Sequence, residues 1–149
     1  MLVDAILAWF HFLLAFVLVG ALVAQAFILR LPVDGRVALL LARVDLFYGI
    51  SAVLLLGVST LRVIWGAKGL SYYEGQPFFW AKIATFVVIG LVSIVPTLVF
   101  RRWSRMAAAS PSFVAPPKEA KRIRGLVVAE THLIALLLAF AVLMARGIG

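Results

Sequence analysis

Four long apolar runs constrain the fold of this chain more than any other feature of its sequence. They cover residues 2–29, 46–65, 78–100 and 126–145. Each is near the ~20 residues that a helix needs to cross the hydrocarbon core of a bilayer. A backbone in lipid must satisfy its own hydrogen bonds, and these runs lack the alternating pattern of barrel strands. We therefore expect an all-α, integral membrane bundle of four transmembrane helices, with residues 1–149 forming a single transmembrane domain.

The composition supports this class and excludes others. The chain is 65% hydrophobic and 13% charged, whereas soluble domains are roughly half apolar and a quarter charged. The net charge of +8 does not indicate a nucleic-acid partner, because the charges cluster beside the apolar runs and no nucleic-acid module appears. This placement is expected for contact with the anionic head groups of a lipid bilayer. The absence of cysteine excludes disulfides and thiol chemistry.

The distribution of basic residues predicts the orientation. Segments 30–45 and 101–124 together hold ten of them: Arg30, Arg36, Arg43, Arg101, Arg102, Arg105, Lys118, Lys121, Arg122 and Arg124. The positive-inside rule therefore predicts that both segments are cytoplasmic loops and that both termini lie outside. The first run has no basic residue before it, so we interpret it as a retained span and not as a cleaved signal peptide.

Prolines predict two local features. Pro96 lies near the end of the third run, where we expect it to kink the helix. Pro111, Pro116 and Pro117 lie between basic clusters, which predicts that residues 101–124 form an irregular segment along the lipid surface.

Ionisable residues within a span are the default functional candidates, because they are costly in lipid. His11 lies among aromatic and aliphatic residues, roughly 12 Å below the outer boundary at 1.5 Å rise per residue. Arg62 and Lys82 begin at a similar depth, beneath the aromatic residues Tyr72 and Trp80. An imidazole with cations and aromatic walls suits a flat anionic ligand such as a porphyrin, and a quinone-type molecule is a second candidate ligand. Above all it suits haem, with His11 as the ligand of the haem iron and the cations on its propionates.

A structural interpretation competes with this one. A histidine inside a helix bundle often only joins helices through a hydrogen bond worth about 1 kcal/mol. Arg62 and Lys82 can equally extend to lipid head groups.

The fourth run carries two further candidates, Glu130 and His132. They lie about 200° apart around a helix, so only one can face the interior. His132 shares a face with Ala135 and Ala139, which favours inward packing and makes it a second candidate haem ligand. We expect Glu130 to pair with an arginine of a cytoplasmic loop.

Stretches such as WFHFLLAFVLVGALVAQAFILR, LRVIWGAKGLSYY and PFFWAKIATFVVIGLVSIVPT resemble an uncharacterised bacterial family of four-helix inner-membrane proteins, a domain of unknown function. More distantly, the chain is similar to HemJ-type protoporphyrinogen oxidases and CopD-type membrane proteins. HemJ-type proteins carry a histidine at the position of His11 and a Trp-x-x-Lys-like motif, which the one residue shorter Trp80-Ala81-Lys82 resembles. The resemblance implies a multi-pass protein of the bacterial inner membrane that binds haem b through His11 and needs Lys82.

Haem-b binding in the outer half of the bundle, serving electron transfer or a small oxidase reaction, is thus the leading functional hypothesis. The alternative is a structural or accessory membrane protein without a cofactor, and a third is permeation of a metal or small solute. We also expect a homo-oligomer, because so thin a bundle leaves polar faces that need cover.

Overall fold

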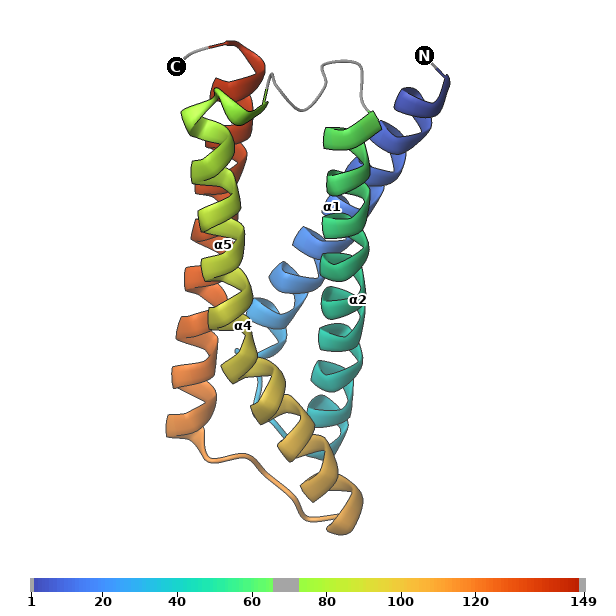
Figure 1. The fold of residues 1–149 in the computed structure, drawn as a ribbon. Coiled ribbons are helices and arrows are strands. Elements are labelled where there is room, and N and C mark those ends of the chain that lie inside the picture. Colours follow the sequence, from blue (N-terminus) through green and yellow to red (C-terminus); the bar gives the residue numbers. More distant parts are fainter. Residues whose placement is uncertain (1, 66–72, 148–149) are drawn as a thin grey trace.

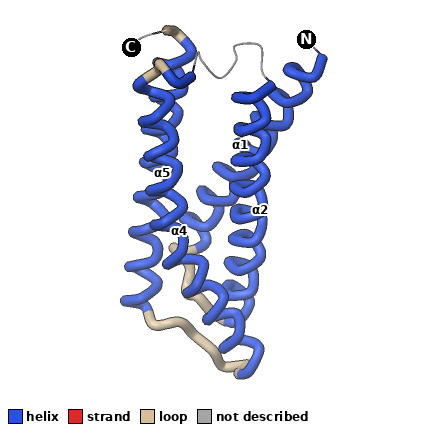
Figure 2. Tube along the Cα trace, in the orientation of Figure 1, coloured by secondary structure: helices blue, strands red, loops and turns tan. Residues whose placement is uncertain are grey.

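Four helices make up most of the chain in a computed structural model that describes residues 2–65 and 73–147. They are α1 (Leu2–Ile28), α2 (Gly35–Trp65), α4 (Pro77–Ala109) and α5 (Pro117–Ala145), joined within the described residues by short loops (Figure 2). Each is long and apolar enough to cross a membrane. The predicted all-α bundle with four candidate spans is confirmed.

The helices form a ring in the order of the sequence. α1 packs on α2, α2 on α4, α4 on α5 and α5 on α1, and across the ring Tyr48 of α2 reaches Glu130 of α5 through its side chain. The start of α1 and the end of α5 lie at one end of the bundle (Figure 1). We call this end the terminal half. The connector half holds residues 29–34 and 110–116, which link α1 to α2 and α4 to α5.

The helices extend well beyond the apolar runs at the connector end. α2 begins at Gly35, α4 continues to Ala109 and α5 begins at Pro117, so most of the expected loops 30–45 and 101–124 is helical. Hydropathy marks the residues suited to the hydrocarbon core, whereas Arg, Lys and Glu are good helix formers that continue a helix into water. The expected loop boundaries were therefore wrong, although the apolar runs were found correctly.

The two connectors pack on each other. The Ala115 amide donates to the Val33 carbonyl at 2.9 Å, and Asp34 forms an isolated β-bridge with Val114. Val33, Phe113 and Ala115 are buried. Residues 101–124 are thus not an irregular segment along the lipid surface. They are two helix ends and a short turn fastened to the other turn.

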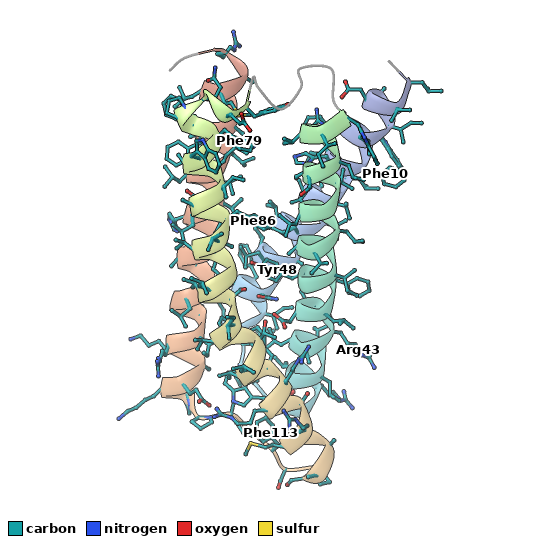
Figure 3. The ribbon with its side chains drawn as sticks, in the orientation of Figure 1. Phe10, Arg43, Tyr48, Phe79, Phe86 and Phe113 are labelled. Carbon is teal, nitrogen blue, oxygen red and sulfur yellow. The ribbon has the colours of Figure 1, made fainter. Side chains whose placement is uncertain are left out.

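The core occupies mainly the connector half. Buried residues recur every three or four positions, as expected for one inward stripe on each helix: Leu18, Ala21, Leu22 and Gln25 on α1, Ala38, Leu41, Asp45 and Tyr48 on α2, Phe100 and Trp103 on α4, and Ile123, Val127, Glu130 and Ile134 on α5. Figure 3 shows Tyr48 between the helix pairs. Because lipid is itself apolar, close packing and hydrogen bonds hold such a core together.

Towards the termini the two helix pairs α1/α2 and α4/α5 diverge (Figure 1). α4 continues through Pro96, which is buried, and changes direction near its middle (Figure 1). A proline removes a helical hydrogen bond and bends the helix, as expected from the sequence. The outward side chains are large and apolar, Phe16 being 76% exposed, which suits contact with acyl chains.

Candidate functional site

His11 lies in the terminal half and contacts α2. Its ring is partly buried, and its Nδ1 shares a hydrogen bond of 3.1 Å with the Ser59 hydroxyl. No described residue hydrogen-bonds to Nε2. A partner on one ring nitrogen fixes the orientation of an imidazole and determines which nitrogen is left to bind something else. Ser59 therefore leaves Nε2 as the nitrogen of His11 that a ligand can use.

Two cations lie near this imidazole. Arg62, one turn beyond Ser59 on α2, and Lys82 on α4 both interact electrostatically with His11 and with each other. Both side chains are partly buried. The Nε of Arg62 is buried without a hydrogen-bond partner, which is unfavourable unless something else satisfies it. Three helices thus bring two positive charges and one imidazole together.

The predicted aromatic walls are less clearly part of this cluster. Tyr72 lies outside the described residues. Trp80 is 56% exposed; its indole N–H donates to the Glu74 carbonyl at 3.2 Å and its ring contacts Phe79. The Trp80 indole is therefore positioned by its own segment and not by α1 or α2.

His132 does not face the interior. Its side chain is exposed, and its Nδ1 lies 2.7 Å from the Val128 carbonyl of the same helix. Ala135 and Ala139 are exposed as well, so the small residues taken as an inward face point away from the bundle. The expected inward packing of His132 was wrong.

Glu130 occupies the inward face of α5 instead. Its side chain is only 1% exposed and its Oε2 accepts a hydrogen bond of 3.0 Å from the Tyr48 hydroxyl. The expected pairing with a loop arginine was therefore wrong too. A tyrosine hydroxyl from α2 supplies the hydrogen bond that a buried carboxyl group requires, and the Ser93 side chain also interacts with that hydroxyl.

A second buried hydrogen-bond group adjoins this pair. Asp45 Oδ1 accepts from Gln25 Nε2 at 3.3 Å and from Thr97 Oγ1 at 3.1 Å. With Tyr48 and Glu130, these residues form a polar core to which every one of the four helices contributes. We call the five residues Gln25, Asp45, Tyr48, Thr97 and Glu130 the polar core.

The sequence contained a partial signal for the polar core. Asp45 and Tyr48 are three residues apart, and Glu130 follows Ile123 and Val127 at helical spacing, so each pattern marks one face. The sequence alone does not indicate which residues of different helices contact each other. The polar core holds two carboxyl groups, and the Oε1 of Glu130 is buried without a partner. It is suited to fixing the order of the helices through directional hydrogen bonds.

Comparison with known proteins gives one result that covers nearly the whole chain. Residues 3–149 match the model of a family described as "Predicted membrane protein (DUF2214)". No match was found among curated proteins or among solved structures. With four candidate spans over the same residues, the chain belongs to this family of predicted membrane proteins.

Proposed function

We propose that the terminal half of the bundle binds a flat anionic cofactor, haem b in the first place. The observation that carries this proposal is the His11 cluster: an imidazole with Nδ1 on Ser59 and two cations, Arg62 and Lys82, acting on it from other helices.

The residues fit the chemistry of haem. A neutral imidazole binds haem iron through one nitrogen while the other nitrogen keeps a hydrogen-bond partner. His11 offers Nε2 for the iron and holds Nδ1 on the Ser59 hydroxyl. Arg62 and Lys82 would neutralise the propionates, and the unpartnered Nε of Arg62 would gain an acceptor. When bound, the haem would supply one-electron redox chemistry.

The shape of the bundle supports a ligand at this level. The helix pairs diverge towards the termini (Figure 1), and the buried stripes of α1, α2 and α5 lie chiefly in the connector half. The similarity of His11 and Trp80-Ala81-Lys82 to HemJ-type proteins points the same way. The protein's own part would be to hold the ligand, orient it through His11 and balance its charge.

An absorption spectrum tests this proposal. We expect protein purified in mild detergent, from cells supplied with haem, to show a Soret band that shifts on reduction. His11→Ala should abolish the band, because the iron loses its ligand. His132→Ala is the matched control, because this histidine is exposed on α5, and it should keep the band. Colourless wild-type protein, or a Soret band that survives His11→Ala, would refute haem binding at this site.

The second candidate is a structural membrane protein without a cofactor. The hydrogen bond between His11 and Ser59 favours it, because the bond joins α1 to α2 without any ligand. In that case His11→Ala and Ser59→Ala should each lower the thermal stability by about 1 kcal/mol. The double variant should then be no worse than either single one, and haem should change none of these values.

A further inference from the structure

A pocket of about 460 Å³ lies between α1 and α5 in the connector half. Along α1, its first lining residue, Ala26, lies 15 residues beyond His11. Its lining consists of Ala26, Phe27, Arg30, Arg124 and Val128. Two arginines from different helices thus share one pocket with three apolar side chains.

Neither guanidinium group has a carboxylate partner among the described residues. The guanidinium of Arg30 lies 4.8 Å from the centre of the Phe27 ring, which holds it by a cation–π interaction. Arg124 is partly buried. The only ion pair within residues 2–65 and 73–147 joins Arg102 to Glu119.

The acidic residues of the connector half are already engaged. Glu119 binds Arg102 and also accepts from the Trp103 indole at 2.9 Å. Asp34 accepts from the Val37 amide at 2.9 Å, at the start of α2. Asp45 and Glu130 belong to the polar core. The two arginines of the pocket are therefore left for an anion from outside the chain.

The level of the pocket indicates which anion. Arg30 follows the apolar run of α1, and Arg124 precedes the apolar part of α5, so both lie where a span meets the head-group region. Ala26, Phe27 and Val128 lie one turn further towards the hydrocarbon. Basic pockets between spans at this level suit lipid head groups. A matching ligand carries a phosphate at the level of the arginines and acyl chains along the apolar wall.

We propose that the pocket between α1 and α5 binds one anionic phospholipid, with its phosphate between Arg30 and Arg124 and an acyl chain against Phe27 and Val128. This is a defined site for one lipid. It differs from the general attraction of basic residues to a charged surface, because the neighbouring Arg36, Arg43, Lys121 and Arg122 do not line the pocket.

Lipid binding to the whole protein in a neutral detergent tests this. Dioleoyl-phosphatidylglycerol is titrated, and retained lipid is counted by native mass spectrometry. Dioleoyl-phosphatidylcholine and inorganic phosphate serve as comparison ligands. We expect one phosphatidylglycerol per chain to be retained. Arg30→Ala/Arg124→Ala should weaken its binding at least about tenfold, as expected on losing two charge-assisted hydrogen-bonding groups.

The matched control is Arg36→Ala/Arg122→Ala, which removes the same charge from exposed positions near the starts of α2 and α5 and should bind as the wild type does. If the double pocket variant does not fold, Arg30→Gln serves, because the Arg30 side chain is exposed; it should still lower the affinity several-fold. Equal losses in both double variants would overturn the proposal in favour of diffuse attraction. Equal retention of phosphatidylcholine would overturn it too. Retention of inorganic phosphate without retention of phosphatidylglycerol would make the site one for free phosphate.

Discussion

At the scale of single residues, hydrogen-bonded polar side chains inside a membrane decide which helices meet. Tyr48 and Glu130 join α2 to α5, while Asp45 joins α1, α2 and α4 through Gln25 and Thr97. A polar group in hydrocarbon is unfavourable without a partner. Any arrangement of the helices that separates these residues would therefore cost free energy. Substitutions of Tyr48 and of Asp45 test how much each group of hydrogen bonds contributes to the stability of the bundle.

We expect Tyr48→Phe to lower the stability by about 1–2 kcal/mol, because it leaves Glu130 buried with neither oxygen bonded. Tyr48→Phe/Glu130→Leu should recover much of the loss, since both polar groups are then absent. Thermal unfolding in detergent measures this, with Thr60→Val as the control, because that hydroxyl only bonds within its own helix. A Tyr48→Phe protein as stable as the wild type would contradict the assigned role of this pair.

Asp45 allows a sharper comparison, because its Oδ1 accepts the hydrogen bonds of both Gln25 and Thr97. Asp45→Asn keeps an oxygen at that place and should stay close to wild-type stability, whereas Asp45→Ala should lose about 1–3 kcal/mol. The same unfolding measurement distinguishes them. Equal losses in both variants would mean that the negative charge of Asp45 matters and not its hydrogen bonds.

At the scale of elements, the connectors explain where the helices begin and end. Asp34 accepts from the Val37 amide, and Pro77 and Pro117 stand in the first turns of α4 and α5, where their missing N–H groups are tolerated. Asp34 and Pro77 are short-range signals of a helix start that a sequence contains, whereas Pro117 was wrongly assigned to an irregular segment. The pairing of Val33 with Ala115 was not predictable, because no local pattern couples segments 82 residues apart.

Asp34→Ala removes the side-chain acceptor at the start of α2, and we expect it to lower the stability by about 1 kcal/mol. Amide hydrogen exchange should also speed up at Val37. Ser112→Ala is the control, because Ser112 is exposed in the other connector and bonds only to Ser110. Unchanged exchange at Val37 would show that the cap is not needed.

At the scale of the whole molecule, the connector half is closed around a polar and aromatic core, and the terminal half is less tightly filled. The apolar runs predicted four spans and antiparallel order, because length and hydropathy are set by the bilayer. They did not predict inward faces correctly on α5. Small residues were taken as the packing face, whereas Ile123, Val127, Glu130 and Ile134 form it. Which face turns inward depends on partners on other helices, and one chain's hydropathy does not contain them.

The cysteine-free chain allows this difference between the halves to be measured. Ser51 is 4% exposed in the core, and Ser59 lies two turns further along α2 and is only partly buried. We expect Ser59→Cys to react with a small neutral thiol reagent at least about tenfold faster than Ser51→Cys, because modification follows access. Similar rates would show that the terminal half is packed as closely as the connector half.

The bond from the Ala115 amide to the Val33 carbonyl has a mechanical consequence. It joins the turn of the α1/α2 hairpin to the turn of the α4/α5 hairpin, at the end where the two hairpins pack together. This contact is therefore the point about which one hairpin would rotate against the other. α1 has 27 residues and is about 40 Å long at ~1.5 Å per residue. A rotation of about 5° about these turns would move the far ends of the helices by about 3.5 Å. A change in how the two turns pack would therefore alter the separation between His11 on α1 and Lys82 on α4.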